Sequence, residues 1–191
     1  MFSQTFRELI RRMEIVQRVI WIMFNVSILI YVAVICFFFG LPTGVAQALR
    51  SNPLSFSICV LAVLTAIASL WIADLILPKR RLRAVLARQP DPSDLLRFHP
   101  AYPVDPVQVA RIKSLPEDEQ RMLALVPLIF NASLVQLAFG NAIALYGSVL
   151  SVTSQSAMPI VPFAVLSLIL NLRISPNLET WLERAARRAA L

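Results

Sequence analysis

Five polar residues inside or at the ends of long apolar segments are the first candidates for chemistry in this sequence. Four are amides and one is a carboxylate: Asn25, Asp74, Asn131, Gln136 and Asn141. A buried amide is costly unless it is hydrogen-bonded, so these side chains should point towards other helices or towards a water-filled cavity. Asp74 lies about one turn inside the end of its segment, which favours a structural ion pair over proton transfer in mid-membrane.

Residue types that carry catalysis or bind metals are scarce. The chain has one histidine, His99, and its two cysteines, Cys36 and Cys59, lie inside apolar segments. One histidine excludes any single-chain site that needs two, such as bis-histidine haem ligation. No CxxC, HExxH or glycine-rich phosphate-binding motif occurs. We therefore predict no catalytic residue, no cofactor and no metal, and interpret His99, near Asp94 and Asp105, as a solvated loop residue.

The composition indicates a membrane protein. Charged residues make up 15% of the 191 residues and the mean hydropathy is +0.69, whereas soluble domains average about 25% charged. No Asp, Glu, Lys or Arg occurs from Met122 to Leu172. That segment is long enough to cross a bilayer twice at about 20 residues per pass.

We predict one all-α membrane domain, residues 1–191, built as a bundle of four transmembrane helices. Hydropathy and turn residues place the spans at residues 19–40, 54–77, 122–146 and 157–172. Residues 1–18 are predicted to form an amphipathic juxtamembrane helix, or a solvated start of the first span, and residues 175–191 an interfacial helix. Residues 78–121 are predicted to be a basic, proline-rich cytoplasmic loop containing a short helix from Pro106 to Ser114. Thr5–Glu8 and Ser114–Glu117 match the capping box that begins a helix.

The distribution of positive charge predicts the topology. Of the eighteen Lys and Arg residues, only Arg50 lies outside residues 1–18, 78–121 and 173–191. By the positive-inside rule, both termini are cytoplasmic, and the net charge of +7 needs no nucleic-acid partner. The densest cluster, Lys79, Arg80, Arg81 and Arg83, is either a topology signal or a contact for anionic lipid headgroups. A bacterial inner membrane is the expected location.

Three functions remain open at this stage. The first is a non-catalytic accessory, assembly or scaffolding subunit that binds other membrane subunits or itself. The second is a small oligomeric transporter or channel lined by Asn131, Gln136 and Asn141. The third is a lipid-modifying membrane enzyme that uses Asp74, His99 and the basic cluster. A pore requires the amides to face water, whereas a scaffold requires neighbouring helices to supply their hydrogen-bond partners.

Overall fold

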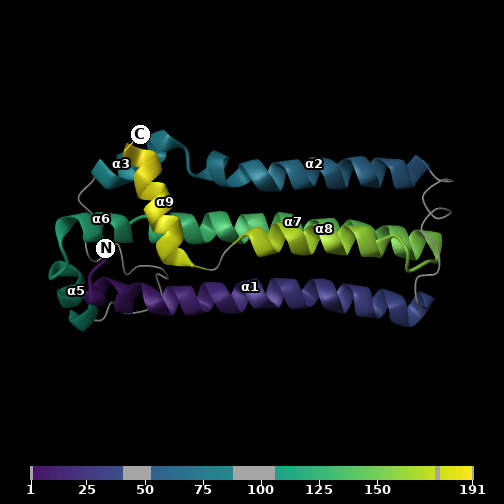
Figure 1. Ribbon diagram of the computed structural model, residues 1–191, viewed down its shortest axis with the longest axis horizontal. Coiled ribbons are helices and arrows are strands. Elements are labelled where there is room, and N and C mark those ends of the chain that lie inside the picture. The colour runs from purple at the N-terminus through teal and green to yellow at the C-terminus, as the bar shows by residue number, and fades with distance from the viewer. Residues whose placement is uncertain (1, 41–52, 88–105, 175–176, 191) are drawn as a thin grey trace. The chain divides into compact units, whose positions relative to one another are not determined.

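The computed structural model describes residues 2–40, 53–87, 106–174 and 177–190, and within these ranges the regular structure is entirely helical. The all-α fold class is therefore confirmed. Figure 1 shows the helices, whose bounds are α1 Gln4–Phe39, α2 Pro53–Ile76, α3 Lys79–Ala87, α5 Pro106–Lys113, α6 Glu117–Leu123, α7 Val126–Ser154, α8 Ile160–Arg173 and α9 Leu178–Ala190.

Three to four helices are candidates for membrane spans. Gln4–Phe39, Ser55–Ile72 and Glu117–Ser154 are each long and apolar enough, and a fourth span is counted only if α8 and α9 together form one bent span. Alone, α8 has 14 residues, or about 21 Å at 1.5 Å per residue, which is less than the bilayer core of about 30 Å. The chain thus has the helices of a membrane protein, with a short α8.

The described chain divides into two compact units. Met1–Arg18, Asp74–Ala132 and Pro176–Leu191 form one, which we call the charged unit, and Val19–Ala73 and Ser133–Ser175 form the other, the apolar unit. Among described residues, every Asp, Glu, Lys and Arg except Arg173 belongs to the charged unit. The three segments that the positive-inside rule placed on one side therefore fold together.

The charged unit has its own hydrophobic core. Phe6 and Ile10 of α1 are buried with residues from α3, α5, α6, α7 and α9, including Leu82, Ile112, Leu123, Ile129 and Leu182. The apolar face of the N-terminal segment therefore packs against protein. The apolar face of α9, formed by Leu178, Leu182 and Ala185, is buried in the same core.

The segment predicted as a loop contains three helices among its described residues. Residues 78–121 contain α3, α5 and α6, and α5 matches the short helix expected after Pro106. The proline-rich stretch from Pro90 to Pro103 lies outside the described residues. Neither capping box forms as predicted. Ser3 rather than Thr5 caps α1, with its Oγ accepting from Phe6 N at 3.2 Å, and α6 begins after Pro116 without a side-chain cap.

In the apolar unit, α8 runs antiparallel to α1. Ile28 packs with Ala164, and Ile35, further along α1, packs with Ile160 at the start of α8. Helix α7 continues to Ser154, beyond the end predicted at residue 146, and Gly147 lies within it. A Cβ on Gly147 would be 2.6 Å from Phe163 Cβ, so this glycine permits close packing of α7 and α8 rather than a turn.

Candidate functional site

The most unusual polar feature of the apolar unit is the amide of Asn171, near the C-terminal end of α8. Its side chain is fully buried, and within the described residues neither Nδ2 nor Oδ1 has a hydrogen-bond partner. The side chain lies against Gly140 of α7, where a Cβ would be 2.1 Å from Asn171 Oδ1. The missing side chain of Gly140 therefore creates the space that Asn171 occupies.

A tryptophan connects α1 to this end of α8, and a second amide lies one turn along α1. Trp21 Nε1 donates to the Asn171 carbonyl oxygen at 2.8 Å, and that carbonyl also accepts from Ile174 N at 3.1 Å. The last turn of a helix leaves carbonyls without intrahelical partners, so Trp21 satisfies one of these in α8. One turn along α1, Asn25 Nδ2 donates to Trp21 O at 2.7 Å.

The two α7 amides of the apolar unit donate to different neighbours. Gln136 is buried, and its Nε2 donates to the Ser69 carbonyl oxygen of α2 at 3.2 Å. Asn141 Nδ2 donates to Ser27 Oγ of α1 at 2.8 Å. These bonds connect α7 to two other helices, which is the use of amides expected in helix packing within lipid.

Four amides on three helices of the apolar unit share one property, and we call them the amide cluster: Asn25, Gln136, Asn141 and Asn171. The side-chain oxygen of each is buried without a hydrogen-bond partner in the described part of the chain. An amide oxygen can accept two hydrogen bonds. Chemically, the cluster offers acceptors for a water molecule, a donor on a ligand, or a cation.

The α7–α8 contact beside the cluster depends on small residues. Ser167 Oγ donates to the Gly140 carbonyl oxygen at 2.7 Å, and Ser151 Oγ accepts from Ile160 N at 3.0 Å. Small residues let helix backbones approach closely in membranes, where serine hydroxyls can bond across the contact. This close packing holds Asn171 in place.

The remaining two of the five polar candidates belong to the charged unit. Asn131 lies near the start of α7 and is exposed, so the structure does not bring it together with Gln136 and Asn141. Asp74 forms an ion pair with Arg188 of α9, and both side chains are about half exposed.

The four residues of the basic cluster have different surroundings on α3. All four side chains are exposed. Arg83 Nε donates to the Ala189 carbonyl oxygen of α9 at 2.9 Å, so it connects the two helices. Lys79, Arg80 and Arg81 form no ion pair with another described residue.

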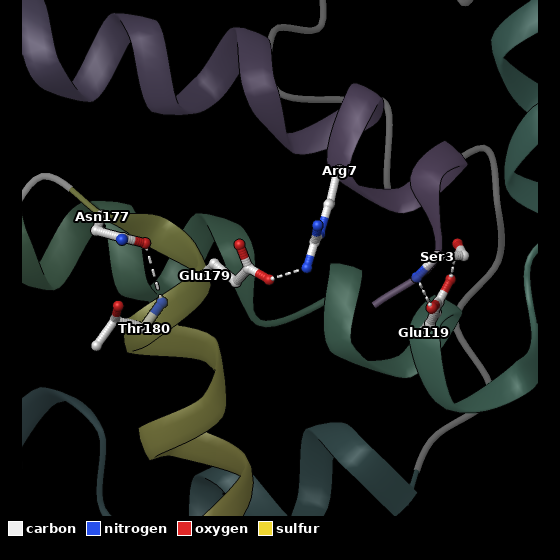
Figure 2. A network of polar contacts seen from close by, with 6 residues as sticks. All are labelled: Ser3, Arg7, Glu119, Asn177, Glu179 and Thr180. Atoms are coloured by element: carbon white, nitrogen blue, oxygen red, sulfur yellow. Dashed lines mark hydrogen bonds and ion pairs between the residues drawn. The ribbon is translucent and has the colours of Figure 1, made fainter. Parts of the chain in front are cut away.

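Two acidic residues hold the N-terminal end of α1 in the charged unit, as Figure 2 shows. The Glu119 carboxylate accepts from Ser3 N at 2.6 Å and from Ser3 Oγ at 2.5 Å. Arg7 forms an ion pair of 3.1 Å with Glu179 in the first turn of α9. Beside it, Asn177 Oδ1 accepts from Thr180 N at 3.1 Å, which caps α9.

His99, Asp94 and Asp105 lie outside the described residues, so the structure does not place the one catalytic or metal cluster considered from the sequence. Among the described residues, no group of three or more His, Cys, Asp or Glu side chains is arranged to hold a metal ion. Cys36 and Cys59 are unpaired thiols of intermediate exposure.

No protein-family model matches this chain, and no curated protein or solved structure shows significant similarity to it.

Asn171, Trp21 and Glu119 were not predicted from the sequence to be structural polar residues. Asn171 stands one residue before the end predicted for the last span and two before Arg173, and has no adjacent polar residue inside the span to mark it. The glycine positions could have indicated the close helix contact beside Asn171. The chain has only four, and two of them, Gly140 and Gly147, lie two turns apart in the charge-free segment, as is typical of close helix contacts.

Proposed function

We propose that this chain is a small multi-pass protein of a bacterial inner membrane, with both termini in the cytoplasm. In this proposal it serves as a non-catalytic accessory, assembly or scaffolding subunit of a larger membrane complex. The observation that carries the proposal is the use of the α7 amides. Gln136 and Asn141 donate to α2 and α1, which supports a packing role for residues that a pore would expose to water.

The charged unit supports the proposed role as a subunit that binds other proteins of a membrane complex. It gathers the charged segments of the chain around a separate core, with most of the charged side chains exposed. A compact unit of this kind offers a docking surface to a partner subunit, and the apolar unit would anchor that surface in the membrane.

Affinity capture of the tagged full chain from its native membrane tests the proposal. The expected result is a membrane-protein partner in stoichiometric amount. The Gly140→Leu variant, expressed at a matched level, is the control, because a side chain at position 140 displaces Asn171 and disrupts the α7–α8 contact. That variant should lose the partner. Recovery of the wild-type chain alone, or only as a homo-oligomer, would contradict the accessory role.

One observation favours a second candidate function, a small transporter or channel. The buried oxygens of the amide cluster have no hydrogen-bond partner among described residues, and oxygen acceptors of this kind bind water or cations along transport pathways. Flux measurements in proteoliposomes distinguish the two candidates. A transporter predicts flux that Gln136→Leu and Asn171→Leu abolish, whereas the accessory role predicts no flux by the chain alone.

A further inference from the structure

We propose that α3 and α9 together bind the headgroup of an anionic phospholipid that carries two phosphate groups. This site rests on the membrane location proposed above and adds a specific ligand to it. The proposal concerns five side chains of the charged unit, which we call the basic corner: Lys79, Arg80, Arg81, Arg184 and Arg187.

The first observation is an arrangement on α3 that helix stability does not explain. Lys79, Arg80 and Arg81 occupy its first turn, and no acidic residue accompanies them there. The positive end of the helix dipole disfavours cations at this position by about 0.3–1 kcal/mol each. All three side chains are exposed. Their placement is unfavourable for the isolated helix and becomes favourable when an anion lies beside it.

The second observation is that α9 contributes further cations. Its apolar residues Leu182 and Ala185 are buried in the core of the charged unit, which leaves Arg184 and Arg187 exposed on the other face. Neither arginine forms an ion pair with another described residue. The acidic residue beside them on α9 is Glu183, so the exposed face of this helix remains net positive.

Two contacts hold these helices together at the corner. Arg83 Nε donates to the Ala189 carbonyl oxygen at 2.9 Å, and Arg188 pairs with Asp74, just before α3 in the chain. Leu82 of α3 and Leu182 of α9 share one core, and Figure 1 shows the two helices adjacent at the C-terminus. Arg83 and Arg188 thus serve as connections. The packed pair of helices therefore carries the cations of the first turn of α3 and of the last two turns of α9, which form no ion pair with another described residue.

The position of this corner in the chain favours a membrane lipid over a soluble anion. The candidate span of α2 ends at Ile72 and α3 begins at Lys79, so the corner follows a candidate span closely along the chain. Each basic residue near an anionic membrane surface strengthens the attraction about fivefold. Five cations on two helices exceed the charge of a single phosphate, which is why we propose a headgroup with two.

Lipid binding to the purified full chain tests this inference. The chain is placed in nanodiscs of zwitterionic lipid that contain a small fraction of a two-phosphate phospholipid, and the bound lipid is counted by native mass spectrometry. One variant combines Lys79→Gln, Arg80→Gln and Arg81→Gln, and a second combines Arg184→Gln and Arg187→Gln. Each should weaken binding of the two-phosphate lipid by about tenfold or more, with little effect on a one-phosphate lipid.

The matched control is Arg11→Gln with Arg12→Gln, which removes two exposed cations from α1 of the same unit. It should change lipid binding by less than about threefold. Circular dichroism and gel filtration check that each variant folds, and the single changes Arg80→Gln and Arg187→Gln replace any combination that does not.

Three results would overturn the inference. They are equal losses in the control and corner variants, equal binding of one-phosphate and two-phosphate lipids, and displacement of the lipid by inorganic phosphate. None of these outcomes bears on whether a partner subunit co-purifies, so failure here is distinguishable from failure of the proposed function.

Discussion

Asn171 of α8 lies so close to Gly140 of α7 that a Cβ on the glycine would be 2.1 Å from Asn171 Oδ1. Only a glycine permits this approach. The hydrogen atoms on its Cα then face the amide oxygen, and weak Cα–H···O contacts of this kind recur at helix–helix interfaces. Together with the bonds from Ser167 to Gly140 and from Trp21 to Asn171, this contact joins α1, α7 and α8 at one level of the apolar unit.

The contact makes a direct prediction about position 140. Gly140→Ala should lower the free energy of unfolding in detergent by about 1–3 kcal/mol, because the added methyl group overlaps Asn171 Oδ1. The measurement is unfolding by SDS followed by circular dichroism. The double variant Gly140→Ala with Asn171→Ala removes the overlapping oxygen and should recover part of the loss. Additive losses from the two changes would show that these residues do not touch.

The Trp21 hydrogen bond can be tested against a second tryptophan. Trp21→Phe removes the donor to the Asn171 carbonyl oxygen and should lower the free energy of unfolding by about 0.5–1.5 kcal/mol. Trp71→Phe is the matched control, because Trp71 is 69% exposed, and it should change stability by less than half as much. Equal effects of the two substitutions would contradict the hydrogen bond.

The bond between Asn141 and Ser27 should appear as a coupling between the two positions. A double-mutant cycle of Asn141→Ala and Ser27→Ala isolates their 2.8 Å contact. Interhelical hydrogen bonds in membrane proteins couple by about 0.6 kcal/mol on average and up to about 1.7 kcal/mol. We expect a coupling energy in this range from SDS unfolding. A coupling energy of zero would show that Asn141 does not bond to Ser27, and would favour the channel or transporter, in which Asn141 faces water.

The Glu119 carboxylate should determine how firmly the first turns of α1 are held. Glu119→Gln keeps the shape but loses one of the two acceptors for Ser3 N and Ser3 Oγ, which should cost about 1–3 kcal/mol locally. Hydrogen exchange of the amides at residues 5–10 should become faster. Asp118→Asn, an exposed neighbour, should leave that exchange unchanged, and faster exchange in both variants would argue against a specific bond.

An Asp74→Asn variant distinguishes a structural ion pair from a carboxylate that carries protons. Its pair with Arg188 is about half exposed, and exposed ion pairs contribute about 0–1 kcal/mol. Asp74→Asn should therefore lower the free energy of unfolding by less than about 1 kcal/mol and leave partner capture intact. Complete loss of partner capture or of cell function in this variant, with the chain still folded, would indicate a chemical role for the carboxylate.

Much of this fold could be predicted from the sequence because lipid imposes simple rules on chain composition. Charge-free segments of about 20 residues must be helical in a bilayer, so α1, α2 and α7 were recognisable. The segments that carry positive charge were also recognisable, and the structure gathers them in the charged unit. Hydropathy did not predict a separate core there, because the apolar faces of residues 1–18 and of α9 suit a membrane surface as well as a protein interior.

The partners of the polar residues could not be predicted. The sequence shows that Gln136 and Asn141 need hydrogen bonds, but whether Ser69, Ser27 or water supplies them depends on the rotation of each helix about its axis. Asn131 shows that position along the chain alone does not predict a residue's surroundings. It was grouped with the other α7 amides by its position along the chain, yet it belongs to the charged unit and is exposed. Conversely, Asn171 stands only two residues before Arg173 and is fully buried.

The native mass of the complex extracted directly from its membrane, without detergent, is the most direct test of the central claim. We predict a complex in which this chain and at least one different membrane protein are present in fixed stoichiometry, and in which the Gly140→Leu variant is missing. A single species whose mass equals one copy of the chain, or a whole-number multiple of it, would contradict the accessory role. The oxygens of the amide cluster, which have no hydrogen-bond partner among the described residues, would then become the starting point for a transport mechanism.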